Sequence, residues 1–184
     1  QDVFEAPHGL VVAIMGVQDP GNVGAIIRAA DAAGATGVLV ADGSASPFGW
    51  KALRGAMGST FRLPVAERVP IATAFAEARR AGFDSYAALP MGGRNLYESD
   101  LTGPVLLLMG GEGPGLDAET ISSADQTIHI PMAPGVESLN VAVAAGVVKV
   151  RATIWDVSMT CRPALDSNRT VPAVPPTYLP LRTC

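Results

Sequence analysis

Cysteine, aromatic residues and charged residues are all scarce in this chain. Of its 184 residues, two are cysteines, 5% are aromatic and 16% are charged. Both cysteines, Cys161 and Cys184, lie beyond residue 155, so the body of the chain has neither a disulfide framework nor a cysteine metal site. No apolar run reaches the roughly 18 residues that a membrane-spanning helix needs. We therefore expect no membrane partner, and a body without cysteine fits the cytoplasm.

An excess of basic residues is also missing. The chain has 13 Lys and Arg against 17 Asp and Glu, a net charge of −4. This balance argues against a broad basic surface for gripping nucleic acid, since such affinity comes mainly from neutralising phosphates. Hydrophobic residues make up 48% of the chain, which excludes a wholly disordered protein. We expect one domain over residues 1–155 and a poorly ordered, Pro-rich tail over residues 156–184, which hold five of the fifteen prolines.

Apolar runs alternate with segments of helical periodicity along the body. Strands are predicted at Leu10–Met15, Val38–Ala41, Thr60–Val65, Phe83–Leu89, Val105–Met109 and Gln126–Ile130. Helices are predicted at Asn22–Ala33, Trp50–Met57, Ile71–Ala81 and Leu139–Trp155. This alternation predicts an α/β fold with a mostly parallel sheet and helices on both faces. Ligands in such sheets bind at the carboxyl ends of the strands, here the loops after Met15, Met109 and Ile130.

The first of these loops leads into a helix and carries an arginine. Its sequence is Asp-Pro-Gly-Asn-Val-Gly over residues 19–24, with Arg28 four residues further on. Asn22 stands where an N-cap is expected, and Gly24 permits the close approach of another backbone. Arg28 lies one turn beyond Gly24 on the same helix face. The loop alone is compatible with a capped helix and a surface arginine, or with an arginine aimed at an anionic or polar substrate group.

The second loop is rich in glycine and holds one carboxylate. Glycine occupies positions 110, 111, 113 and 115, directly after the apolar run Val105–Met109. This is not a dinucleotide-binding fingerprint, because Leu116 stands where that pattern has glycine, and no Gly-Lys-Ser/Thr follows as in a P-loop. The glycines permit a tight turn or a flat ligand against bare backbone. Glu112 favours a functional reading, since a simple turn does not need a carboxylate there.

The third loop, residues 130–140, contains two prolines and a glycine before an apolar helix. Either Ser138 or Asn140 opens that helix, and a simple N-cap is the structural interpretation of Ser138. A serine-hydrolase reading lacks support, because the two histidines are His8 and His129, and His129 is expected to pack in mid-strand. Clustered metal ligands are also absent from the sequence, so no metal is predicted.

Together, in this order, the three loops resemble the SpoU/TrmH family of RNA ribose methyltransferases in the SPOUT superfamily. The first matches the family's Asn-x-Gly-x-x-x-Arg, the second its Gly-x-Glu-x-x-Gly-Leu with an offset in glycine placement, and the third its Ile-Pro-Met and Ser-Leu-Asn-Val. The matching positions are Asn22, Gly24, Arg28, Gly110, Glu112, Gly115, Leu116, Ile130–Met132, Gly135 and Ser138–Val141. Lys51–Val65 resembles a further family segment, Arg-x-Ser-x-Gly, with Ala56 in place of Ser.

The resemblance implies a C-terminal catalytic domain with a trefoil knot that binds S-adenosylmethionine. It also implies a homodimer and an RNA substrate (rRNA or tRNA), and it raises the expectation of a missing N-terminal RNA-binding domain. By position, the implied cofactor contacts are Gly110, Ile130, Leu139, Met132 and Gly115. The implied catalytic residues are Arg28, Asn22, Ser138, Asn140 and Glu112. Because a guanidinium keeps its proton at neutral pH, Arg28 fits a phosphate-gripping role better than that of a base.

Three alternatives stay open at the level of sequence. A relative that methylates a base nitrogen would share the superfamily fold, and an inactive RNA-binding knot would share the motifs. A generic nucleotide-binding α/β domain would explain the glycines but not Arg28 together with Ser138 and Asn140. If the chain meets RNA directly, the acidic body leaves the contacts to a local basic set. Its candidates are Arg28, Lys51, Arg54 and Arg62.

Overall fold

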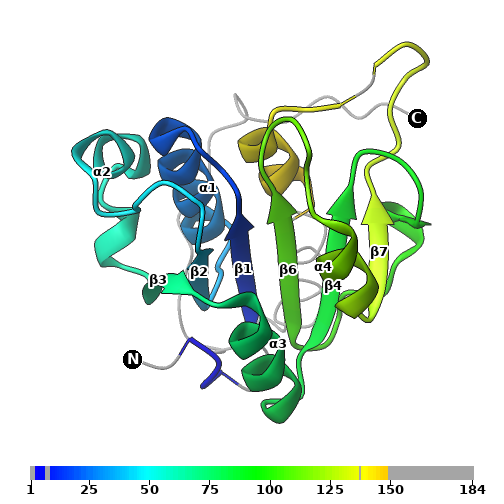
Figure 1. Ribbon diagram of the computed structural model, residues 1–184, viewed down its shortest axis with the longest axis horizontal. Helices are drawn as coiled ribbons and strands as arrows, with labels where there is room; N and C mark the ends of the chain where they lie inside the picture. Colours follow the sequence, from blue (N-terminus) through cyan, green and yellow to red (C-terminus); the bar gives the residue numbers. More distant parts are fainter. Residues whose placement is uncertain (1–2, 7–8, 137, 149–184) are drawn as a thin grey trace, which may run out of the picture.

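The computed structural model describes residues 3–6, 9–136 and 138–148 (Figure 1). The Pro-rich tail at residues 156–184 and the part of the predicted last helix beyond Val148 lie outside the described residues. Within the described part, no helix combines the length and apolar character needed to cross a membrane.

A parallel sheet of seven strands forms the centre of the molecule. Its order is β3-β2-β1-β6-β4-β7-β5, and every neighbouring pair is parallel. The strands are β1 (Leu10–Met15), β2 (Gly37–Ala41), β3 (Val65–Val69), β4 (Asp84–Leu89), β5 (Arg94–Asn95), β6 (Val105–Gly110) and β7 (Gln126–His129). The predicted α/β class with a parallel sheet is confirmed.

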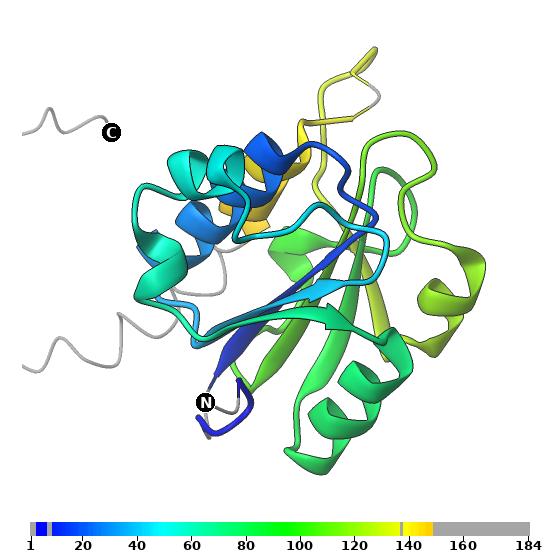
Figure 2. The same cartoon turned by 60° about the vertical axis from the view of Figure 1, so that its left-hand side comes forward.

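Helices cover both faces of this sheet (Figure 2). They are α1 (Pro20–Ala32), α2 (Trp50–Ala56), α3 (Ile71–Arg80), α4 (Ala118–Ser123) and the helical residues 141–148, with short 3₁₀ turns at η1 (Ser59–Phe61) and η2 (Leu96–Glu98). The side chains of α1 and of residues 141–148 share one buried core with alternate residues of β1 and β6. Those of α3 pack on the opposite face. Strands buried on both faces explain why β1 and β6 read as continuous apolar runs.

The register of the strands brings three loops to one edge of the sheet. Met15 at the end of β1 pairs with Gly110 at the end of β6. Ala88 near the end of β4 pairs with Met109, and the next residue of β4, Leu89, pairs with His129 at the end of β7. The chain leaves β1 towards β2 on one side, whereas β6 and β4 lie on the other. This is the kind of position where open α/β sheets bind ligands.

Two local predictions are wrong. The N-cap of α1 is Asp19, and Asn22 lies inside the first turn, because Pro20 occupies a starting position where its missing N–H costs nothing. The strand predicted at Thr60–Val65 is instead η1 followed by β3 at Val65–Val69. Met57 and Gly58 both have positive φ, so the chain turns sharply after α2. Thr60, which follows this turn, is buried.

Candidate active site

The glycine loop after β6 is a tight turn packed on backbone. Gly111 forms an antiparallel bridge with Gly115. A Cβ on Gly111 would lie 2.1 Å from the carbonyl oxygen of Gly16, and one on Gly110 would lie 2.6 Å from the backbone of Gly115. Gly113 and Gly115 have positive φ. Glycine is therefore required here by close backbone contacts and by the turn itself, and the turn holds Glu112 at its outer end.

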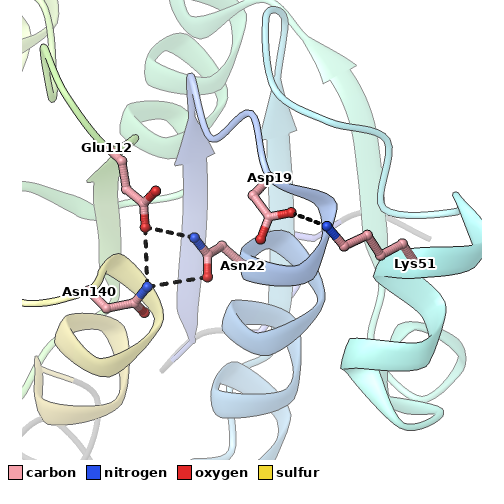
Figure 3. A network of polar contacts seen from close by, with 5 residues as sticks. All are labelled: Asp19, Asn22, Lys51, Glu112 and Asn140. Carbon is pink, nitrogen blue, oxygen red and sulfur yellow. Dashed lines mark hydrogen bonds and ion pairs between the residues drawn. The ribbon is translucent and has the colours of Figure 1, made fainter.

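Three loops that are far apart in the sequence meet through one polar network (Figure 3). Asn22 Nδ2 donates to Glu112 Oε1 at 2.8 Å. Asn140 Nδ2 donates to the same carboxylate oxygen at 3.2 Å and to Asn22 Oδ1 at 3.3 Å. The structure thus brings together three of the five predicted catalytic residues, one from each motif.

Asn140 also begins the helical segment at residues 141–148. Its Oδ1 accepts hydrogen bonds from the backbone N–H groups of Ala142 at 3.0 Å and Val143 at 3.4 Å. This is N-cap geometry, so Asn140 performs the capping role that the sequence left open between Asn140 and Ser138. Because both ends of its amide are engaged, the side chain of Asn140 is held in one orientation.

Beside this network, a cavity of about 210 Å³ opens at the carboxyl ends of β4, β6 and β7. One ordered water needs only roughly 10–15 Å³, so the cavity accommodates an organic ligand. Its lining includes all five predicted cofactor residues, Gly110, Gly115, Ile130, Met132 and Leu139. Glu112 and Ser138 line it as well, so Glu112 belongs both to the network and to the cavity wall.

Several lining residues were not predicted as site residues. They include Leu89 and Pro90 after β4, Leu116 after the glycine loop, and Val141, Ala144 and Val148 on the last helical segment. The pairing of β4 with β6 places Leu89 at this edge, but that pairing is not visible in the order of the strands along the chain. His129 also lines the cavity; it is the last residue of β7 rather than a mid-strand residue, and its buried Nδ1 has no hydrogen-bond partner among the described residues.

The charge of the cavity wall is one-sided. Among the described residues that line it, Glu112 is the one carboxylate, and neither Lys nor Arg contributes. Such a wall suits a ligand with positive charge and disfavours the phosphates of a nucleotide cofactor, which need basic side chains or the free N–H groups of a helix start. Within the described part of the chain, no group of three or more His, Cys, Asp or Glu side chains is arranged to hold a metal ion.

Helix α1, which carries Asn22 of the network, is held close to α2. A Cβ on Gly24 would lie 2.2 Å from the carbonyl oxygen of Ala52, as expected for a glycine that admits another backbone. Lys51 Nζ on α2 pairs with Asp19 Oδ1 at 2.7 Å (Figure 3). The hydrogen bond from Lys51 is the main reason why the pKa of Asp19 lies below its ordinary value. Arg28 is exposed one turn beyond Gly24 and takes no part in the network around Glu112.

The comparison with known proteins agrees with this geometry. The family described as SpoU rRNA Methylase matches residues 9–150. The chain belongs to this family. The resemblance of its three loops to SpoU/TrmH enzymes is thereby confirmed, and all three loops lie within the matched range.

Individual relatives show the same likeness. The 23S rRNA (guanosine(2553)-2'-O)-methyltransferase RlmP of Bacillus subtilis is 39% identical over 137 residues, which are 74% of this chain and 55% of RlmP. A 23S rRNA (guanosine-2'-O-)-methyltransferase RlmB of Xanthomonas campestris is 36% identical over 80% of this chain and 60% of RlmB. The solved SpoU methyltransferase AviRb of Streptomyces viridochromogenes, in complex with AdoMet, superposes with a TM-score of 0.77 at 35% identity, covering 83% of this chain and 62% of AviRb. This chain therefore spans only about 55–62% of the length of these three relatives.

Proposed function

We propose that this chain is the catalytic domain of an enzyme that transfers a methyl group from S-adenosylmethionine to a ribose 2′-hydroxyl in rRNA or tRNA in the cytoplasm. One observation carries the proposal: Glu112 joins Asn22 and Asn140 in a network and at the same time lines a cavity at the carboxyl ends of the strands. A ligand site and a polar site thus share a wall. The named relatives, which are rRNA 2′-O-methyltransferases, support RNA and the ribose as substrate.

The cavity fits S-adenosylmethionine better than a nucleotide with phosphates. When bound, this cofactor supplies a methyl group activated by a positively charged sulfur. Apolar side chains such as Ile130, Leu139 and Met132 would pack on its adenine, and the backbone at Gly110 and Gly115 would lie against it. Glu112 offers the single negative charge on a wall without cations, which complements a sulfonium.

The chain's own residues would place and deprotonate the hydroxyl. A ribose 2′-hydroxyl becomes a good nucleophile only as its proton leaves, so the protein must position it in line and assist that loss. The amides of Asn22 and Asn140 are fixed by Glu112 and, with Ser138 on the cavity wall, offer hydrogen-bonding groups for the ribose. Arg28 would bind the adjacent phosphate, whose oxygen would accept the proton.

Arg28 lies outside the network of its own chain, and this supports an assembly of two subunits. We infer a homodimer in which Arg28 of one subunit approaches the site of the other. Exposed apolar side chains beside the site favour such a contact: Leu139 is 37% exposed and Val143 is 54% exposed. Large apolar groups of this kind at a surface are typical of a subunit interface.

Two further parts of the expectation belong to the same proposal. A trefoil knot, which the resemblance to the family implies, would hold Ile130, Met132 and Leu139 at the cavity wall that they line. Capture of the RNA would fall mainly to a further N-terminal domain, as the acidic balance of 17 Asp and Glu against 13 Lys and Arg suggests.

Methyl transfer with a labelled cofactor tests the proposal. The purified chain is incubated with S-adenosylmethionine carrying a radioactive methyl group and with separated rRNA and tRNA fractions. Alkali cleaves RNA through the 2′-hydroxyl, so a methylated ribose protects its own linkage and the label is expected in alkali-resistant dinucleotides. Label in mononucleotides would point to a base-nitrogen methyltransferase. A wild-type chain that shows no thermal shift with the cofactor would instead be an inactive RNA-binding protein.

A further inference from the structure

Helix α2 has its small residues inside and its large ones outside. Ala52 and Ala56 are fully buried, and Ala52 packs against Gly24 of α1. Trp50 and Arg54, at spacing i and i+4, share the opposite, outward face, and Met57 follows them as the C-cap residue in the left-handed conformation. Trp50 is 72% exposed and Met57 is 66% exposed. An ordinary surface helix places its large apolar side chains towards the core, so this outward face calls for a partner.

The segment that contains α2 also differs from the rest of the chain in charge. Residues 43–66 include Lys51, Arg54 and Arg62 but no Asp or Glu, although acidic residues outnumber basic ones by 17 to 13 in the whole chain. Lys51 and Arg62 form ion pairs with Asp19 and Asp31. Arg54, on the outward face of α2, is exposed and has no ion pair or hydrogen bond within the described residues. A further aromatic side chain of this segment, Phe61, is 76% exposed.

Helix α2 lies on the same edge of the molecule as the site, and its outward face is turned away from α1. Figures 1 and 3 place α1 between α2 and the helical segment that begins at Asn140. Along the same edge, the Lys51–Asp19 pair follows the network of Asn140, Glu112 and Asn22. A chain-like ligand bound at the cavity can therefore extend across the start of α1 to α2.

We propose that the outward face of α2, formed by Trp50 and Arg54, together with the C-cap residue Met57, binds unpaired nucleotides of the RNA near the one that is methylated. This deepens the proposed function and rests on it. Aromatic side chains stack on unpaired bases, and an arginine beside them pairs with phosphate. A second copy of the chain fits less well, because a two-fold contact through this face would bury Arg54 of each copy, and the face offers no carboxylate to pair with it.

Binding of a fluorescein-labelled, unstructured 15-nucleotide RNA, followed by fluorescence anisotropy, tests this surface. Trp50→Ala is expected to weaken binding about 5- to 100-fold, the range for loss of one base stack. Arg54→Ala is expected to weaken binding and to lower the slope of log affinity against log salt by about one. The matched controls are Met91→Ala, which lies outside this segment and is 76% exposed against 72% for Trp50, and Arg80→Ala on α3; both should bind like the wild type.

Unchanged RNA binding by Trp50→Ala and Arg54→Ala, or equal losses of binding in the control variants, would overturn the proposed RNA-binding surface. A changed molar mass of Trp50→Ala in light scattering would also overturn it, because the face would then be a contact between subunits. Methyl transfer separates this proposal from the function. If the wild type methylates RNA and Trp50→Ala keeps the same KM for RNA, the surface is wrong and the function stands. If the wild type methylates no RNA fraction while single-strand binding still depends on Trp50, the function is wrong and the surface stands.

Discussion

Replacing Gly24 with alanine should separate α1, which carries Asn22 of the site, from α2. The new Cβ would lie 2.2 Å from the carbonyl oxygen of Ala52 and 2.9 Å from the backbone nitrogen of Ala56. Both are backbone atoms and cannot rotate away, so we take the upper end of the roughly 1–3 kcal/mol that overpacking costs. Alanine recovers about 0.5–1 kcal/mol as the better helix former. The net loss is about 2 kcal/mol, or roughly 4–8 °C in Tm for a domain of this size.

Gly146 provides a matched control, because it also lies within a helical segment. Apart from its neighbours and the backbone of its own helix, no atom of the described residues lies within 4 Å of a Cβ built on Gly146. Gly146→Ala should therefore raise the free energy of unfolding by about 0.5–1 kcal/mol and Tm by roughly 1–4 °C. Thermal melts followed by circular dichroism compare the two variants directly. If Gly24→Ala melts at or above the wild-type temperature, α1 and α2 are not packed through Gly24, and the placement of Lys51 beside the site loses its basis.

Three further predictions concern the network and its surroundings. Glu112→Ala should lower kcat about 10- to 100-fold, because it frees the amides of Asn22 and Asn140. Glu112→Gln keeps a hydrogen-bond acceptor. Its kcat should therefore be partly restored if Glu112 acts by positioning the amides, and not restored if the charge of Glu112 is required. Asn140→Ala should lower the free energy of unfolding by about 1 kcal/mol through loss of the cap, whereas Asn140→Asp keeps the cap and the stability but loses activity, because it repels Glu112. Partial burial alone would raise the pKa of Asp125, but hydrogen bonds from Ser85 outweigh it and hold that pKa below its ordinary value. The stabilisation that Asp125 provides is present above the unfolded-state pKa of about 3.9 and is lost as pH falls through the lower folded-state pKa. In urea melts below pH ~4, the free energy of unfolding should therefore fall more steeply with pH in the wild type than in Asp125→Asn.

The parts of the fold that were predicted correctly are those whose local pattern reflects full burial. β1 and β6 lie between two layers of helices, and their apolar runs match the observed strands within one residue. The prediction at Thr60–Val65 was wrong because β3 is an edge strand. Its exposed Glu67 and Arg68 break the apolar pattern, and Arg68 has a positive φ. β5, with two residues, and α4, with six, are too short to give a periodic signal.

The site was predictable as a set of loops but not as a set of contacts. Motif residues in the three loops mark Asn22, Glu112 and Asn140 individually. Their hydrogen bonds span 90 and 118 positions of the sequence and depend on β1 and β6 being neighbours, which the strand order along the chain does not reveal. The resemblance also implied a role for Arg28, yet a single chain leaves it on an exposed part of α1.

The most direct test of the central claim is mass spectrometry of nucleosides from RNA treated with this protein. S-adenosylmethionine with a deuterated methyl group is supplied with the wild type and, in parallel, with Arg28→Ala. We expect deuterium on the ribose fragment of one nucleoside with the wild type. Arg28→Ala should lose nearly all of this signal while calorimetry shows unchanged cofactor affinity. Deuterium on a base fragment, or near-normal ribose labelling by Arg28→Ala, would contradict the account.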